Sequence, residues 1–162
     1  MAGKRRATAV FALSASAFVA LAMSEGYRST AYIPVPGDVP TIGFGTTGGV
    51  RLGDTITPPR ALSRALSDIQ KFEGALKKCV IVPLHQHEYD AFVRLAYNIG
   101  ASAFCNSTLV KLLNQGRYAE ACEQIKHWNR QGKKILPGLA KRRQAEYDQC
   151  IGKTSDLAEN EG

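Results

Sequence analysis

Two carboxylic acids and a threonine lie close together near the start of this 162-residue chain: Glu25, Asp38 and Thr41. Cleavage of a glycosidic bond needs one acid that protonates the leaving oxygen. It also needs a second carboxylate that places water or stabilises the oxocarbenium-like transition state. An acid beside an apolar segment is kept protonated by desolvation, whereas a carboxylate in a polar turn stays ionised. Glu25 follows a long uncharged run and Asp38 lies in PGDVP, so this pair predicts glycoside hydrolysis.

The same residues also have ordinary structural interpretations. Asp is frequent in turns because its side chain bonds its own backbone, and Thr41 has the residue type of a strand. On the residues alone, Asp38 is therefore expected to be a turn residue more often than a catalytic one.

The N-terminal segment has the pattern of an export signal. Lys4, Arg5 and Arg6 form a basic cluster, and no charged residue follows until Glu25. The positive-inside rule then places the N-terminus in the cytoplasm and the chain after Ser24 outside.

Two kinds of export signal fit residues 7–24. Ala20-Leu21-Ala22 is a small-x-small cleavage site, as in a signal peptide. The run is also long enough for an uncleaved anchor, although Ala and Ser make it weakly hydrophobic. Cleavage after Ala22 would leave Glu25 third from a fraying terminus. If Glu25 does chemistry, the segment must stay attached, which favours the uncleaved anchor.

The chain as a whole is basic, with a net charge of +7. Between Lys111 and Arg143 there are nine Lys or Arg against two acids. This charge favours anionic lipid or an anionic cell wall, with a solvated helical face as the alternative. Arg142 and Arg143 either contact the wall or pair with nearby acids. No RNA-binding signature or zinc-finger spacing accompanies the charge, so nucleic acid is not expected.

The element pattern indicates an α+β fold. Residues 27–51 are rich in Pro, Gly and β-branched residues, which predicts a short irregular β-hairpin or three-stranded sheet. Helical spacing of apolar residues then predicts helices. Their expected ranges are 57–78, 84–100, 107–113, 118–128 and 139–151. Trp128 is expected in the core.

Metal chemistry is not indicated by the sequence. His85, His87 and Glu88 lack the spacing of a zinc protease and are expected to be surface helix residues. No C-x-x-C is present, so we expect no metal and no cofactor. Four Cys residues follow the export segment, and disulfides with three possible pairings or free buried thiols remain alternatives.

Three stretches carry a resemblance to a known family. They are EGYRSTAYIPVPGDVPTIGFGTTGG, FVRLAYNIGASAFCNSTLVKLLNQGRYAEACEQIKHW and GLAKRRQAEYDQC. Together they resemble the phage-type lysozymes, glycoside hydrolase family 24, over nearly everything from Glu25 to Cys150. This resemblance implies cleavage of the β-1,4 bond between N-acetylmuramic acid and N-acetylglucosamine in peptidoglycan.

The family's catalytic set is a Glu, then eight residues, an Asp or Cys, then five residues and a Thr. The resemblance implies Glu25 as general acid and Thr41 as its partner. The spacing differs here, because Pro34 stands at the expected acid position and Thr41 falls one residue late. Asp38 is the nearest carboxylate and is our candidate for the second acid. Thr46 stands where the family often has His after its Gly-x-Gly.

The resemblance also implies a mostly helical lysozyme-like fold, in which a small β lobe and a helical lobe enclose an active-site cleft. It favours the disulfides Cys79–Cys105 and Cys122–Cys150. Asn98 is a candidate for binding substrate acetamido groups, with bracing of the backbone as the alternative.

Some phage endolysins of this kind carry a signal-anchor-release segment, and residues 1–24 resemble one. The resemblance implies Sec export and an inactive enzyme tethered in the host inner membrane. Collapse of the membrane potential by holin or pinholin would then release the enzyme to the periplasm. We expect a lysozyme-like domain over 25–152, a flexible tail over 153–162, and a monomer. The alternatives are a non-hydrolytic, membrane-tethered peptidoglycan-binding protein and a secreted lysozyme with a cleaved signal.

Overall fold

The computed structural model describes residues 3–153, so nearly all of the expected flexible tail lies outside the described residues. The chain divides into two compact units. The small unit is Phe18–Lys71, and the large unit is Met1–Ala17 together with Phe72–Gly162. The structure is 57% helical with a small two-stranded sheet lobe, which confirms the α+β class.

Residues 7–24 of the N-terminal segment do not form one continuous helix. A 3₁₀ turn, η1, covers Thr8–Val10, and the helix α1 covers only Ala15–Glu25. Helix α1 begins late because the Ser14 hydroxyl accepts a hydrogen bond from the Ala17 N–H at 3.2 Å, which caps its first turn. Among residues 3–153, no helix has both the length and the apolar character needed to cross a membrane.

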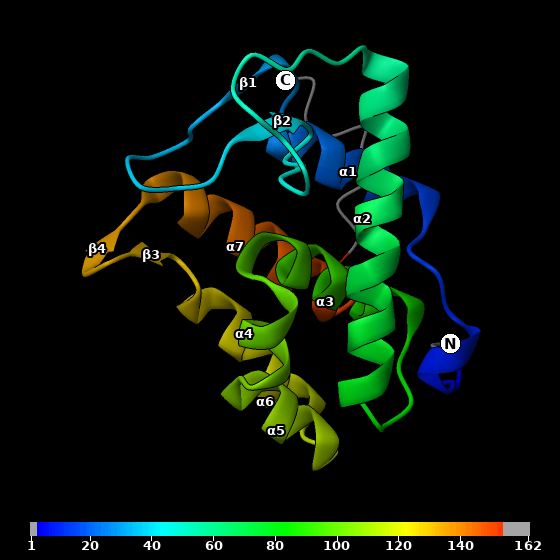
Figure 1. Cartoon of the computed structure of the whole chain (residues 1–162). Helices are drawn as coiled ribbons and strands as arrows, with labels where there is room; N and C mark the ends of the chain where they lie inside the picture. The colour runs from blue at the N-terminus through cyan, green and yellow to red at the C-terminus, as the bar shows by residue number, and fades with distance from the viewer. Residues whose placement is uncertain (1–2, 154–162) are drawn as a thin grey trace. The chain divides into compact units, whose positions relative to one another are not determined.

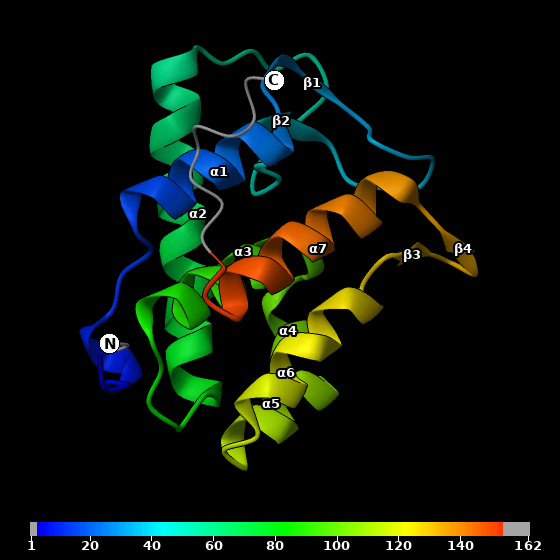
Figure 2. The ribbon, with the colours of Figure 1, turned by 180° about the vertical axis from the view of Figure 1, so that it is seen from behind.

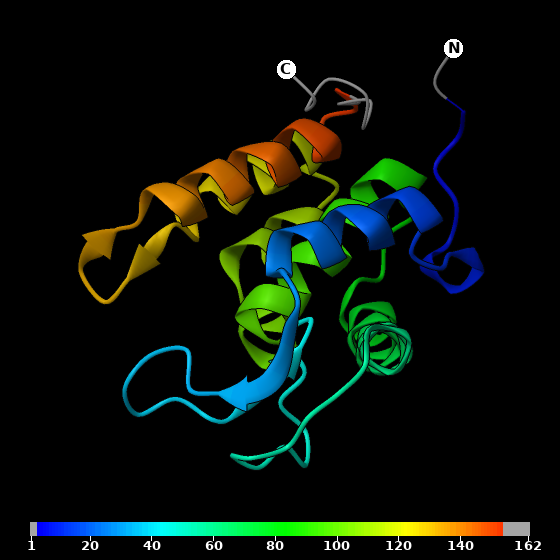
Figure 3. The same cartoon turned by 90° about the horizontal axis from the view of Figure 1, so that it is seen from above.

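The small unit contains the expected short hairpin. Strand β1, Arg28–Tyr32, pairs antiparallel with strand β2, Thr41–Gly43, and the long loop between them is visible in Figure 3. An isolated bridge between Thr30 and Thr55 adds a partial third edge. Ala31, Ile42 and Val50 form a small buried apolar cluster against Ile56. The core of this unit is therefore small and made mainly of aliphatic side chains.

Helix α2, Pro58–Cys79, has nearly the expected bounds and passes from the small unit into the large one. Its buried apolar side chains include Ala61, Ala65, Ile69 and Leu76. Leu62 and Leu66 have the same helical spacing in the sequence, but both are exposed. The true buried stripe is narrower than the apolar stripe in the sequence.

The large unit is built from helices, shown from two sides in Figures 1 and 2. They are α3 (Gln86–Ile99), α4 (Ala101–Cys105), α5 (Thr108–Asn114), α6 (Tyr118–Gln124), the 3₁₀ turn η2 (Ile125–His127) and α7 (Pro137–Cys150). Ser107 caps α5 as expected, because its hydroxyl accepts from the Val110 N–H at 3.2 Å. The sequence did not predict α4 or the small hairpin of β3 (Arg130–Gln131) and β4 (Lys134–Ile135).

Two disulfides connect the helices of the large unit, with the pairing that the family resemblance implies. Cys79–Cys105 joins the end of α2 to α4, and Cys122–Cys150 joins α6 to the end of α7. The alternative of four free thiols does not hold. Trp128 is only partly buried, so the expectation of a core position is met in part.

Two charged residues of the large unit, Arg143 and Glu88, are buried. Arg143 is fully buried and its guanidinium lies 2.9 Å from the Glu146 carboxylate, so it pairs with an acid and does not face the wall. Glu88 is 3% exposed and is not a surface residue. Its partner is Arg5, far away in the sequence, and sequence spacing carries no signal for such a pair.

Candidate active site

Glu25 is the last residue of α1 and is partly buried. The helix ends there because the Gly26 N–H donates to the Ala22 carbonyl at 3.1 Å while Gly26 adopts φ +69°. This left-handed conformation is strained for any residue with a Cβ. The Glu-Gly pair therefore puts an acid at a helix end and turns the chain directly into β1.

Thr41 is the first residue of β2, and it is 7% exposed. Its hydroxyl donates to the Val39 carbonyl at 3.2 Å, so the oxygen can still accept a hydrogen bond from water. Thr41 lies opposite Tyr32, while Gly43 lies opposite Arg28, so two steps along β2 match four along β1. A bulge of this kind changes the direction of side chains and is frequent beside active sites.

The glycines of TIGFG allow a close approach to α2. A Cβ on Gly43 would lie 3.0 Å from the Ala61 Cβ, and Gly43 has φ +64°. Gly45, with φ +88°, forms the turn that lets Ile42 and Thr46 exchange two backbone hydrogen bonds of 2.9 and 3.0 Å. Both glycines are therefore required by the backbone path that begins at Thr41.

The start of β1 and the TIGFG motif are also joined by aromatic side chains. The rings of Tyr27 and Phe44 lie 5.5 Å apart, and the Tyr27 hydroxyl donates to the Ile56 carbonyl at 2.6 Å. Tyr27 is two residues after Glu25, and Phe44 is three after Thr41. This contact ties the segment carrying the candidate acid to the segment carrying the candidate threonine.

A buried Thr–Asp pair fastens the same turn to α2. Thr46 is 1% exposed, and its hydroxyl donates to the Asp68 carboxylate at 2.8 Å. Thr46 was identified from the sequence as a replacement for His, whereas Asp68 was not predicted, because it has the pattern of an ordinary charge on a helix. Only Thr46 pointed to this pair, since a hydroxyl that is buried needs a hydrogen-bond partner.

Asp38 lies in the turn between β1 and β2 and is exposed. Its N–H donates to the Val35 carbonyl at 3.0 Å, and its side-chain oxygen accepts from the Val39 N–H at 2.9 Å. The structure thus gives Asp38 the turn role that its residue type favours, while leaving its carboxylate exposed. Glu25, Asp38 and Thr41 all belong to the small unit, whereas Asn98 is an exposed residue of α3 in the large unit.

In the part of the chain that the structure describes, no group of three His, Cys, Asp or Glu is arranged to hold a metal ion. The two histidine rings near the start of α3, His85 and His87, are stacked with centroids 5.2 Å apart. His87 Nδ1 lies 3.1 Å from the carbonyls of Gln149 and Cys150. His87 therefore has a structural contact, between α3 and the end of α7.

Comparison with known proteins gives one family over most of the chain. The family model described as phage lysozyme matches residues 22–146. A protein of Pseudomonas phage phiKMV named SAR-endolysin is 38% identical over 148 residues, covering 89% of this chain and 91% of that protein.

Solved structures agree in fold. The endolysin from Escherichia coli O157:H7 phage FAHEc1 superimposes with a TM-score of 0.79 at 33% identity, covering 90% of this chain and 96% of that one. A crystal structure of a P22 lysozyme mutant gives a TM-score of 0.75 at 35% identity, covering 88% of this chain and 99% of the other. The matched family segment contains all three candidate catalytic residues.

Proposed function

Because this chain belongs to the phage lysozyme family, it is a lysozyme-type glycoside hydrolase of peptidoglycan and an endolysin, and we propose how its activity is delivered and controlled. The enzyme is exported through Sec, tethered in the host inner membrane by residues 1–24, and inactive there. Collapse of the membrane potential through holin or pinholin releases it to the periplasm. The non-hydrolytic alternative is disfavoured by the family membership.

The catalytic part of the proposal assigns four roles. Glu25 protonates the glycosidic oxygen as the bond breaks, which is the task of the general acid in this chemistry. Thr41 accepts a hydrogen bond from a water molecule, since its own proton is directed to the Val39 carbonyl. Asp38 supplies the second carboxylate, and Asn98 binds the acetamido group of the sugar.

One observation carries the tether proposal: the second half of the export segment and the candidate acid form a single helix, α1, that ends at Glu25. Two large apolar side chains of this helix, Val19 and Met23, are exposed at i and i+4. When residues 15–24 lie in a bilayer, Glu25 is at the membrane surface. The helix with its terminal acid then has to leave the membrane before the small unit can assemble around it.

Fractionation of Gram-negative cells tests this proposal. Wild-type protein, expressed with the inner membrane energised, is expected in the membrane fraction. After a protonophore collapses the potential, it is expected in the soluble periplasmic fraction at unchanged mass. Protein that is soluble before the collapse, or that has lost its first 22 residues, would establish the secreted lysozyme with a cleaved signal instead.

A further inference from the structure

Three carboxylates of the large unit are buried beneath the N-terminal arm, which we define as residues 5–14. Glu73, Glu88 and Asp90 are 8%, 3% and 4% exposed. Buried carboxylates are costly unless they are paired and hydrogen-bonded. Each of these three accepts at least one hydrogen bond from the arm.

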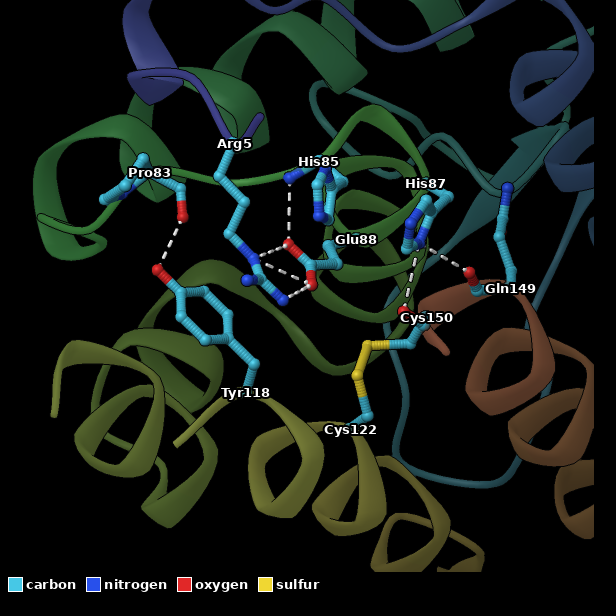
Figure 4. A network of polar contacts seen from close by, with 9 residues as sticks. All are labelled: Arg5, Pro83, His85, His87, Glu88, Tyr118, Cys122, Gln149 and Cys150. Atoms are coloured by element: carbon cyan, nitrogen blue, oxygen red, sulfur yellow. Dashed lines mark hydrogen bonds and ion pairs between the residues drawn. A yellow bond between two sulfur atoms is a disulfide. The ribbon is translucent and has the colours of Figure 1, made fainter. Parts of the chain in front are cut away.

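At one end of the arm, Arg5 binds Glu88 (Figure 4). The Arg5 Nε lies 3.2 and 3.1 Å from the two Glu88 oxygens, and its Nη2 lies 2.7 Å from one of them. The guanidinium also lies over the Tyr118 ring, 3.6 Å from its centroid. The hydrogen bond to Glu88 raises the pKa of Arg5 further above its ordinary value. The next residue, Arg6, exchanges two backbone hydrogen bonds of 2.8 Å with Leu84.

The middle of the arm meets Glu73 and Tyr89. The ring of Phe11, itself buried, stacks on Tyr89 with centroids 5.3 Å apart. Glu73 Oε1 accepts from the Leu13 N–H at 2.7 Å and from the Tyr89 hydroxyl at 2.7 Å. Burial, and then the hydrogen bond to Glu73, raise the pKa of Tyr89 far above its ordinary value, so the hydroxyl remains a donor.

At its other end the arm is held by Asp90. The Asp90 carboxylate accepts from the Ser14 N–H at 2.9 Å and from the Ser14 hydroxyl at 2.6 Å. Gln86 contacts both the arm and Asp90. Its side-chain amide donates to the Ala12 carbonyl and to the Asp90 carboxylate, both at 2.9 Å. The same Ser14 oxygen accepts from the Ala17 N–H in the first turn of α1. The hydrogen bonds from Ser14 to Asp90 therefore also position the N-terminal cap of α1, the helix that ends at Glu25.

We propose that Glu73, Glu88 and Asp90 form an intramolecular docking site that captures residues 5–14 as they leave the membrane, and that this capture makes release effectively irreversible. The inference rests on the proposed tethering. In the tethered form, Arg5 lies on the cytoplasmic side by the positive-inside rule, so these carboxylates lack their arm donors. Without the arm, the three carboxylates keep only the donors of the large unit itself, Tyr89, His85 and Gln86. The docked state is therefore favoured by the added charge-assisted hydrogen bonds from the arm.

Arg5→Lys is the sharpest test because it keeps the positive charge that sets topology. Lys presents a point charge and loses the fork that reaches both Glu88 oxygens. Arg6→Lys is the matched control, since the Arg6 side chain lies over the Phe11 ring, 5.0 Å from its centroid, and does not enter the carboxylate site. After collapse of the potential, we expect release of Arg5→Lys to be about fivefold slower than that of wild type, and Arg6→Lys to match wild type.

A second readout uses purified full-length protein and does not depend on the membrane. Ser14→Ala and Asp90→Asn should speed hydrogen exchange in residues 8–14 about tenfold, because Asp90 holds the Ser14 amide and hydroxyl. Circular dichroism identifies a variant that has not folded, in which case Ser14→Ala, which keeps all three carboxylates, decides the result. Arg6→Lys should exchange as wild type does.

The outcomes separate this inference from the proposed function. Slower release of Arg5→Lys with faster exchange in the Ser14 and Asp90 variants supports capture. Wild-type release after depolarisation together with unchanged Arg5→Lys release overturns capture and leaves the tether intact. Wild-type protein that never enters the membrane fraction overturns the tether and the capture role with it.

Discussion

The two units of the molecule are stabilised in different ways. The large unit has two disulfides and helices packed around buried aromatic side chains such as Tyr89, Phe92 and Phe104. The small unit has a two-stranded sheet with a bulge and a core cluster of Ala31, Ile42 and Val50. All three candidate catalytic residues belong to the small unit.

This difference shows where precise placement comes from in a region with little regular structure. In the small unit, single contacts hold residues in place, whereas extensive packing does so in the large unit. Gly43 admits α2 at close range, and Thr46 hydrogen-bonds Asp68. Functional residues are often held on irregular segments supported by a more rigid scaffold. The comparison predicts that changes in the small unit affect activity first, whereas changes in the large unit affect stability first.

Glu25→Gln should have the largest effect on activity. Removal of the general acid is expected to lower the rate of peptidoglycan clearing by about 10²–10⁴-fold, because an amide cannot protonate the leaving oxygen. Turbidity loss of purified Gram-negative peptidoglycan measures the rate. Binding to sedimented wall should stay unchanged, and circular dichroism checks the fold. A variant that clears at the wild-type rate would remove Glu25 from its proposed role.

The double variant Cys122→Ala with Cys150→Ala should lower stability and leave activity nearly unchanged, the opposite of Glu25→Gln. This disulfide closes a loop with a sequence separation of 28, so its removal should lower the free energy of unfolding by about 3–4 kcal/mol. Urea titration measures the loss. Clearing at low temperature should remain close to wild type, because the candidate catalytic residues lie in the other unit. If the variant is folded but inactive, the division of roles between the units is wrong.

Asp38→Asn tests whether the turn acid takes part in chemistry. Loss of Asp38 as the second carboxylate should slow clearing by about 10–100-fold, a smaller effect than loss of the general acid. Asp54→Asn is the matched control, because Asp54 also accepts a backbone hydrogen bond in an exposed turn of the small unit, from the Arg51 N–H at 2.8 Å. Equal rates for the two variants would reduce Asp38 to a turn residue.

Thr46→Val should have the smallest effect of the four. Val keeps the shape of the side chain but leaves Asp68 without the hydroxyl, which should cost about 1–3 kcal/mol of stability. Thr46→Ser keeps the hydroxyl and serves as the control. Because this turn begins at Thr41, we also expect a several-fold loss of clearing activity in Thr46→Val. If stability falls and activity does not, the pair is purely structural.

The sequence predicted the regular parts of the fold well, and the reason is physical. Helices α2, α3 and α5 have apolar periodicity and recognisable end residues, such as Ser107 before α5. These signals are local. Helix α4 and the β3–β4 hairpin were missed because each has too few residues to show a period.

Contacts between residues that are far apart in the chain could not be predicted from the sequence. The pairs Thr46–Asp68 and Arg5–Glu88 join residues whose spacing has no pattern. Residues 7–24 form a packed arm and a shorter helix in this structure. Their Ala- and Ser-rich composition fits this structure and a membrane helix equally well. The environment decides between these two structures, and sequence periodicity does not contain that information. The roles of Glu25, Asp38 and Thr41 stay predictions for the experiments above.

In the proposed active enzyme, the export segment and the candidate acid Glu25 are one continuous piece of chain. Intact mass spectrometry of the released, wall-clearing form is the measurement that tests this. We expect a single active species near the full-length mass of 17.6 kDa, with residues 15–25 present. An active species that has lost its first 22 residues would show that Glu25 works without α1, and the continuous helix would then have no role in activity.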